Sequence, residues 1–385
     1  MIYLDNSATA PLKKEVLDSM MPYLTGGYGN ASSIYEIGRK SRAAIEEARK
    51  TIAERIGALP GEIYFTAGGS ESDNWAIKGV MARSAKTHII SSAIEHHAVL
   101  HTLQFMEKKG YKVTYLPVDS DGKISLSDLE NAITEETGLI TIMTANNEIG
   151  TIEPIEKIGE IAKKHNVLFH TDAVQAIGLM DINVKEMNID MLSMSAHKFG
   201  GPKGIGVLYV RRGINIENLI HGGAQERTKR AGTENVASIV GMAKAIELAT
   251  EDINGKTAKM AELRDKTIAS ILEKIPYVRL NGHKTDRLAG NINMSFQYIE
   301  GEALLLSLDM AGIAASSGSA CTSGSLDPSH VLLAIGLPHE IAHGSLRLSM
   351  SENTTEEEME KTVSALCGIV DRLRQMSPLW EEVNK

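Results

Sequence analysis

Short apolar runs alternate with amphipathic segments through the first half of this chain. Strands are expected at residues 62–66, 88–91, 112–116, 139–143 and 167–170. Helices are expected near 73–83, 98–109, 126–132 and 155–165. Strands that alternate with helices form a mainly parallel sheet flanked by helices. The pattern therefore predicts an α/β fold, in which ligands bind at the carboxyl ends of the strands.

The 385 residues of the chain are enough for two domains. A long polar loop at 221–235 leads into a helix from 236 to about 257, whose continuation to 275 has the character of a connector. A second and smaller alternation of strands and helices follows from about 276. We therefore predict a large α/β domain at 15–257, and a small α+β domain that combines 1–14 with 258–385.

Composition excludes several classes of protein. The net charge of −9 argues against direct nucleic-acid binding, which requires a basic surface. No run of about 18 apolar residues predicts a transmembrane helix, and the first residues do not resemble a signal peptide. Two cysteines, Cys321 and Cys367, make no disulfide framework. We therefore expect a cytoplasmic protein without a membrane span.

Lys198 lies on a turn of small and hydroxyl-bearing residues between two apolar runs, 189–192 and 207–210. A lysine on a loop is usually solvated. Held against a ligand, its amine can instead form a Schiff base with an aldehyde cofactor such as pyridoxal 5'-phosphate (PLP). The turn alone is compatible with either interpretation.

PLP requires further groups around such a lysine. Asp172 follows a strand and suits the pyridinium nitrogen, and His96 follows another strand and suits the ring face. Asn147 and Gln175 suit the phenolic oxygen. The phosphate suits the Gly-rich turn that precedes a helix, because a helix N-terminus attracts anions. The candidates for phosphate binding are Gly69, Ser70, Ser195, His197 and Thr233.

Each of these residues also has a purely structural interpretation. Asp172 could cap a helix, His96 could be a buried imidazole with its hydrogen bonds satisfied, and Asn147 could stabilise a turn. A plain strand-to-helix turn has the same sequence character as the phosphate turn at Gly69.

Taken together, the motifs resemble the cysteine desulfurases of the class V aminotransferase group, which supply sulfur for iron–sulfur clusters. The resemblance extends over nearly the whole chain. Its motifs lie at 4–9, 65–74, 95–99, 146–150, 170–175, 195–198, 230–233 and 317–321. It implies the PLP-dependent transferase fold of type I, L-cysteine as substrate, and no catalytic metal.

The resemblance also assigns roles. It implies a homodimer in which Thr233 reaches the PLP phosphate of the other subunit. Asn147 and Arg347 would bind the substrate, with the planar guanidinium of Arg347 on the carboxylate. Lys198 would remove the Cα proton of cysteine. His96 would stack on the PLP ring and transfer protons near the substrate sulfur.

Cys321 lies among small residues at 315–325, which predict an exposed loop. Free cysteines are more often buried, and Cys367 in the apolar run 363–370 fits that pattern. A thiolate on a loop can collect sulfur and carry it outward. With the resemblance, this predicts a Cys321 persulfide that passes sulfur to an acceptor protein.

Some positions depart from the family pattern. Ala31 and Tyr35 replace a usual Pro and His, Glu153 replaces Gln, and Ser351 with Glu352 replaces Gly and Arg. The sequence ends soon after Trp380, whereas relatives that dock an iron–sulfur scaffold carry a longer tail. The sulfur acceptor therefore stays open. Selenocysteine lyase and aminotransferase are the alternative activities.

Overall fold

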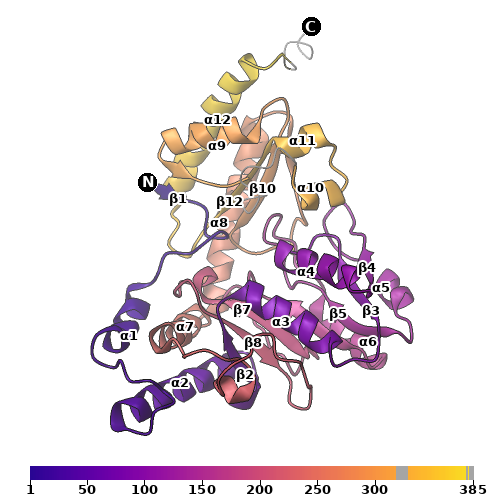
Figure 1. The fold of residues 1–385 in the computed structure, drawn as a ribbon. Helices are drawn as coiled ribbons and strands as arrows, with labels where there is room; N and C mark the ends of the chain where they lie inside the picture. Colours follow the sequence, from indigo (N-terminus) through magenta and orange to yellow (C-terminus); the bar gives the residue numbers. More distant parts are fainter. Residues whose placement is uncertain (318–327, 379, 381–385) are drawn as a thin grey trace.

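A seven-stranded sheet organises the larger part of the protein in the computed structural model, which describes residues 1–317, 328–378 and 380 (Figure 1). In sheet order its strands are β2 (Ile63–Thr66), β8 (Gly206–Val210), β7 (Met191–Ser195), β6 (Leu168–Asp172), β5 (Thr137–Thr141), β3 (His88–Ser92) and β4 (Lys112–Leu116). The five strands from β7 to β4 run parallel to one another. β8 runs antiparallel to both of its neighbours, β7 and β2, so β2 points in the same direction as the five. The predicted mainly parallel sheet is therefore confirmed.

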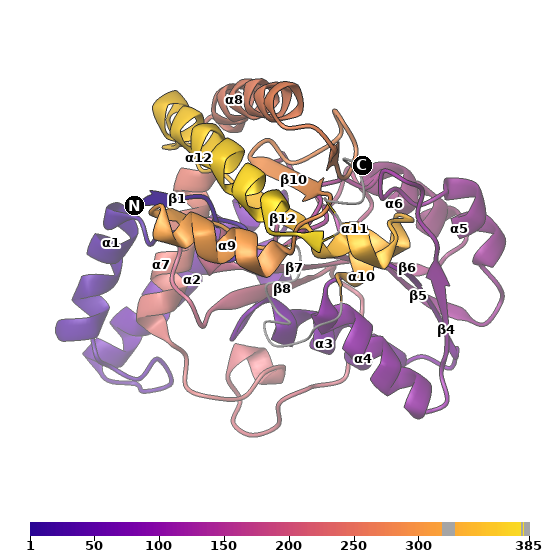
Figure 2. The ribbon, with the colours of Figure 1, turned by 90° about the horizontal axis from the view of Figure 1, so that it is seen from above.

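Helices cover both faces of this sheet (Figure 2). One face packs against α1 (Lys14–Thr25), α2 (Glu36–Arg55), α5 (Leu126–Ala132), α6 (Ile155–Lys164) and α7 (Val236–Ala249). The other face packs against α3 (Gly69–Met81) and α4 (His97–Lys108). Apolar residues are buried on both sides, for example Ile52 beneath the first group and Trp75 beneath the second. Burial on two faces explains why these strands are continuous apolar runs.

A second unit with its own core lies against the carboxyl ends of the parallel strands (Figure 1). Its strands are β9 (Val278–Leu280), β10 (Asn291–Phe296) and β12 (Ser345–Ser349), with β1 (Ile2–Tyr3) paired to β11 (Ile313–Ala314). Its helices are α8 (Ile253–Lys274), α9 (Gly301–Met310), α10 (His330–Ala334), α11 (His339–His343) and α12 (Glu356–Gln375). Leu4 is fully buried in this core, so the first residues of the chain pack with the last third.

The predicted single helix from residue 236 to about 257 is wrong. α7 ends at Ala249, and α8 begins at Ile253. Between them Asp252 adopts a left-handed conformation with φ of 49°, and its carboxylate accepts a hydrogen bond from the backbone N–H of Gly255. An aspartate cap of this kind starts a new helix and sets its direction. The predicted boundary at 257 therefore falls inside α8.

The helix predicted from residue 73 begins earlier, at Gly69. Gly68 precedes it with φ of 155°, a conformation that favours glycine. A side chain at Gly206 on β8 would lie 2.6 Å from the Cα atom of Gly68. Two glycines in contact therefore let the turn before α3 lie directly on β8.

Among the departures from the family pattern, Glu352 has a clear structural role, because it forms ion pairs with Lys13 and Lys256. Glu153 is buried, and one of its carboxylate oxygens accepts a hydrogen bond from the backbone N–H of Ile124. Ala31 is buried, and Tyr35 is exposed. In the described part of the chain, no helix combines the length and apolar character that a membrane span requires.

The second core depends on α8, and a pair of neighbouring residues tests this. Ile271 is fully buried, whereas Leu272 is 44% exposed. We expect Ile271→Ala to lower the free energy of unfolding by about 2–5 kcal/mol, because it leaves a cavity. Leu272→Ala should cost about 1 kcal/mol or less. Denaturant unfolding measures both values, and equal losses would contradict the packing described here.

Candidate active site

Lys198 lies in a short 3-10 turn, Ala196–Lys198, immediately after β7. Its ammonium group donates hydrogen bonds to the backbone carbonyls of Ser7 at 2.6 Å and Ala8 at 2.9 Å. The amine is therefore not a solvated loop lysine. It points back across the sheet edge to a segment near the start of the chain.

That N-terminal segment also contacts two other predicted residues. The side-chain amide of Gln175 donates to the same Ser7 carbonyl at 2.9 Å. The Nδ1 atom of His197 lies 3.2 Å from the hydroxyl of Thr9. Residues 7–9 thus bring Gln175, His197 and Lys198 together. Sequence reasoning missed this role, because a backbone carbonyl acts without any signal in residue type.

Asp172 and His96 complete the group at the carboxyl ends of the strands. Asp172 ends β6, is buried, and accepts a hydrogen bond from the backbone N–H of Val174 at 2.9 Å. Burial raises the pKa of Asp172 to about 6, and the charge of Lys198 opposes this shift. Burial, followed by the charge of Lys198, lowers the pKa of His96 to about 4. His96 is therefore neutral near pH 7, and Lys198 lies within electrostatic reach of both residues.

The turn before α3 lies beside this group. A side chain at Gly69 would come within 2.7 Å of the side chain of Val174, which is two residues after Asp172. Ser195 is buried, and its hydroxyl lies 3.8 Å from the Cβ position of Gly68. Ser70 is exposed in the first turn of α3. The first turn of this helix, with the positive end of its dipole, is thus next to Asp172 and Ser195.

Arg347 reaches the site from β12 of the second unit. It is only 2% exposed, and its two terminal nitrogens donate to the backbone carbonyl of Asn147 and to the carboxylate of Asp5, each at 2.9 Å. If Arg347 binds the substrate carboxylate as predicted, it must do so while it keeps or exchanges these two hydrogen-bond partners. Asn147 contributes a backbone carbonyl here.

This contact belongs to a longer strip of backbone. The carbonyl oxygens of residues 147–150, which we call the carbonyl strip, all accept hydrogen bonds from the second unit. The donors, in order, are Arg347, then Asn291 with Asn293, then Arg287, and then the backbone N–H of Leu288.

Thr233 is exposed in the loop between β8 and α7. The same loop contains three successive non-glycine residues with positive φ, namely Glu226 at 45°, Arg227 at 57° and Thr228 at 67°. Each such residue costs about 1–2 kcal/mol. A buried ion pair offsets this cost, because the carboxylate of Glu226 accepts two hydrogen bonds of 2.7 Å from the guanidinium of Arg49.

Cys321 lies outside the described residues. Cys367 is in α12 and packs at the margin of the second core, as predicted for a structural cysteine.

Two buried carboxyl groups, Asp73 and Glu95, interact with Asp172; both fall within the motifs at 65–74 and 95–99, but no role was predicted for either. Asp73 on α3 and Glu95 before α4 are both buried. Burial, followed by the charge of Asp172, raises the pKa of Asp73, and the charge of Asp172 also contributes to the raised pKa of Glu95. Burial raises the pKa of Glu95 to about 8, although one of its oxygens accepts hydrogen bonds from Ser92 and from the backbone N–H of Met143. These groups lie behind the site rather than in it.

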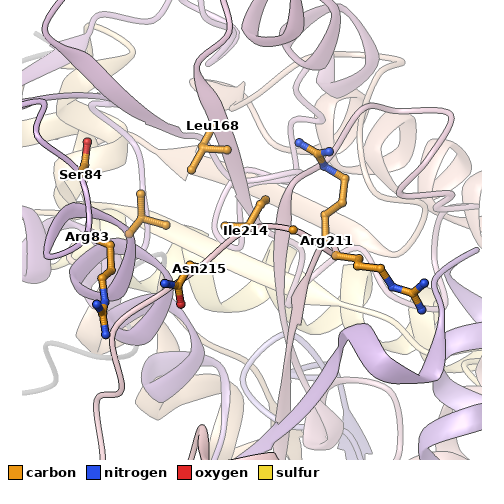
Figure 3. Close-up of a pocket in the computed structure, with 9 residues that line it drawn as sticks. Arg83, Ser84, Leu168, Arg211, Ile214 and Asn215 are labelled. Atoms are coloured by element: carbon orange, nitrogen blue, oxygen red, sulfur yellow. The ribbon is translucent and has the colours of Figure 1, made fainter.

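A cavity of about 430 Å³ lies at the start of β6, the opposite end of that strand from Asp172 (Figure 3). It is lined by Leu168 at the start of β6 and by Ile214, with Arg83 and Arg211 on either side. Arg83 pairs with Glu217 and Arg211 pairs with Asp190. None of the predicted site residues lines this cavity, and its two paired arginines already have counterions.

The sequence model of the family described as aminotransferase class V matches residues 2–362. The chain belongs to this family. "Cysteine desulfurase IscS" of Clostridium botulinum is 57% identical over 388 residues, which is 100% of this chain and 98% of that protein. The protein of the same name from Methanosarcina thermophila is 58% identical over 380 residues, or 98% and 94% of the two chains. A solved structure titled "NIFS-LIKE PROTEIN" aligns with a TM-score of 0.91 at 38% identity, covering 97% of this chain and 100% of that one.

The predicted family, the type I fold and the dependence on PLP are therefore confirmed, and the chain is an enzyme. The residues present fit the cofactor. A buried carboxylate at Asp172, an amine at Lys198 within its electrostatic reach, and the first turn of α3 beside them match the nitrogen, the aldehyde and the phosphate of PLP. In the described part of the chain, no group of His, Cys, Asp and Glu side chains could hold a metal ion.

The raised pKa of Glu95 predicts a pH-dependent stability. A carboxyl whose pKa is raised from 4.5 to about 8 by folding keeps its proton in the folded state while the unfolded chain has lost it. The stabilisation that Glu95 gives the folded state is therefore full below pH 4.5 and is lost as the pH rises to about 8. Glu95→Gln removes this dependence. The stability of the wild type relative to E95Q should fall over this range, by up to about 1.4 kcal/mol per pH unit. Denaturant unfolding at pH 5 and pH 8 measures the difference, and a constant difference would contradict the prediction.

Proposed function

We propose that this protein is a cysteine desulfurase, which converts L-cysteine to L-alanine and transfers the sulfur as a persulfide. Relatives named cysteine desulfurase match the chain over its full length and support this activity. The observation that carries the proposal is the grouping of Lys198, Asp172 and His96 at the carboxyl ends of the strands.

We assign the cofactor contacts as the sequence predicted. Lys198 would hold the aldehyde carbon of PLP, Asp172 its ring nitrogen and His96 its ring face. Asn147 and Gln175 would serve the phenolic oxygen. The phosphate ligands would be Gly69, Ser70, Ser195 and His197, with Thr233 from the other subunit. When bound, PLP supplies a ring that withdraws electrons from the Cα atom of the substrate.

Lys198 acts as the base that takes the Cα proton of cysteine. Its ammonium group is held by the carbonyls of Ser7 and Ala8, so the amine has fixed acceptors for its protons on this side of the site. His96 is neutral at physiological pH, because its pKa is about 4, so its imidazole offers one hydrogen-bond donor and one acceptor to the PLP ring and to the substrate sulfur. Ionised Asp172 stabilises a positive charge on the ring nitrogen.

Arg347 is assigned to the substrate carboxylate. The guanidinium already contacts the carboxylate of Asp5, so a substrate carboxylate would replace one negatively charged partner with another. The Nε atom of Arg347 is buried and has no hydrogen-bond partner among the described residues. A buried guanidinium with one open donor supports the binding of a further acceptor.

Cys321 is assigned as the sulfur carrier. Its thiolate forms a bond to the substrate sulfur as the bond between that sulfur and Cβ breaks. The electron pair of the broken bond stays on Cβ, which takes up a proton. The remaining amino acid is then released as L-alanine. The product on the enzyme is a Cys321 persulfide, from which an acceptor protein takes the outer sulfur.

The finer assignments are part of the proposal. The active enzyme would be a cytoplasmic homodimer, with domains at 15–257 and at 1–14 with 258–385. The separate second core, which includes Leu4, supports this division. The acceptor would be a protein, for example an iron–sulfur scaffold. Loading the enzyme with ³⁵S-labelled cysteine and isolating the labelled partner would identify it.

The two cysteines of the chain provide a matched test of the carrier. Cys321→Ala should lower the release of sulfide from L-cysteine at least about 100-fold with a reductant present, since the nucleophile is lost. Cys367→Ala should retain activity, because that thiol packs in α12. Methylene-blue detection of sulfide gives both rates. Sulfide release that survives in C321A would exclude the mechanism. Glutamate formed from added 2-oxoglutarate would favour an aminotransferase, because the amino group of cysteine would then have moved to the keto acid.

Loss of the base should stop the reaction before sulfur transfer. Lys198→Ala should slow the formation of alanine from cysteine by about 10²–10⁴-fold, which is the usual contribution of a general base. Chromatographic measurement of alanine gives the rate. Lys203→Ala, which changes an exposed lysine of the same segment, is the control. Equal rates in K198A and wild type would show that another group removes the proton.

A further inference from the structure

Arg230 precedes Thr233 by three residues and connects the loop between β8 and α7 to the turn before α3. Its Nε atom lies 2.9 Å from one carboxylate oxygen of Glu71, and its Nη2 atom lies 3.2 Å from the other. The pair is bidentate and mostly buried, with side-chain exposures of 22% and 14%. Bidentate pairing with a carboxylate fixes the orientation of both groups.

Glu71 has a second contact in the turn itself. The backbone N–H of Ala67 donates to the same carboxylate at 3.0 Å. One carboxylate therefore ties together the start of the proposed phosphate turn, the first turn of α3 and the loop that carries Thr233.

The segment between Arg230 and Thr233 is too short to act as a flexible tether. Three extended residues span at most about 11 Å. Within that span the backbone N–H of Gly232 donates to the side chain of Gln225. A shift of Glu71 or Arg230 must therefore displace Thr233.

The loop is also held at its other side, by the buried pair of Glu226 and Arg49. The carboxylate of Glu226 accepts from the backbone N–H of Phe65 on β2, so this anchor too is fixed next to the turn (Figure 1). Both anchors of one strained loop thus attach to the two ends of the segment from β2 to α3. A loop that served only as a connection would not require them.

We infer that Arg230 is a positioning residue, whose ion pair with Glu71 couples the phosphate turn of one subunit to the Thr233 that serves the other subunit. The inference rests on the proposed function, in which PLP phosphate binds at this turn and Thr233 acts across the dimer. A phosphate turn held in place by PLP then fixes the position of the loop at 226–233. A fixed loop in turn places Thr233 in the PLP site of the other subunit. Binding of PLP and formation of the dimer should therefore favour each other, by the same factor in both directions.

Two measurements on the full chain test this coupling. Equilibrium dialysis gives the dissociation constant of PLP, and sedimentation gives the dissociation constant of the dimer with and without PLP. The variants are Arg230→Gln, Glu71→Gln and the double variant. Lys229→Gln is the control, because it removes the same charge from the neighbouring, half-buried position, whose ammonium group donates to Asn215 and not to Glu71. Thermal unfolding shows that each variant is folded.

In the wild type, PLP should tighten the dimer by about 5–150-fold, the usual range of such coupling. In R230Q and E71Q this factor should fall to near one while a dimer still forms without PLP. The double variant should match the single variants, because one interaction is lost in each. K229Q should retain the wild-type factor.

A full coupling factor in folded R230Q overturns the inference. If that variant does not fold, the double variant decides, since it leaves no unpaired charge. Thr233→Ala separates this inference from the proposed function. If T233A leaves the affinity for PLP unchanged, the role of Thr233 across the dimer is wrong and the inference falls with it. If T233A weakens PLP binding and R230Q keeps the full factor, only the role of Arg230 is wrong.

Discussion

The carbonyl strip at 147–150 is the contact on which the geometry of the site depends. Its four acceptors belong to the turn between β5 and α6 of the larger unit, and all of its donors belong to the second unit. Buried carbonyls and guanidinium groups are costly without partners, so the two units can separate here only by breaking the whole set. Because the strip includes Asn147 and one of its donors is Arg347, the same bonds that join the two cores also fix the two residues proposed to bind the substrate.

Burial of carboxyl groups is the second feature of this region. Asp73, Glu95, Glu148, Glu153 and Asp172 are all buried, and burial raises the pKa of each. Asp172 differs from Glu95 and Glu153 because the charge of Lys198 lowers its pKa. Because Glu95 has a pKa of about 8, it retains its proton near pH 7 and adds no negative charge beside Asp172, which leaves the ionised group at Asp172, where a cationic ring nitrogen needs it. The electrostatics of the site thus depend on residues that contact neither substrate nor cofactor.

Much of the fold followed from local pattern, and the rest needed three-dimensional contacts. The alternation of strands and helices predicted the sheet, because burial on both faces leaves apolar runs. The break at Asp252 was missed, since a single residue in a left-handed conformation leaves the apolar pattern intact. In the site, Lys198, Asp172 and His96 were identified by motif. Motifs did not identify the roles of three other groups, because backbone acceptors and long-range pairing leave no signal in residue type. These are the carbonyls of Ser7 and Ala8, the carboxylate of Asp5 that pairs with Arg347, and the acids behind Asp172.

The contacts of the N-terminal segment have a consequence for how the protein is made. The side chain of Asn6 donates to the backbone carbonyl of Ser349, 343 residues later, and Asp5 pairs with Arg347. The carbonyls that hold the Lys198 amine lie in this same segment. Asp5 and Asn6 are therefore synthesised more than 300 residues before the partners to which they bind. The large sheet can assemble during synthesis, but the active site is complete only after β12 has been made. A chain truncated before β12 would therefore fold in part and lack a complete site.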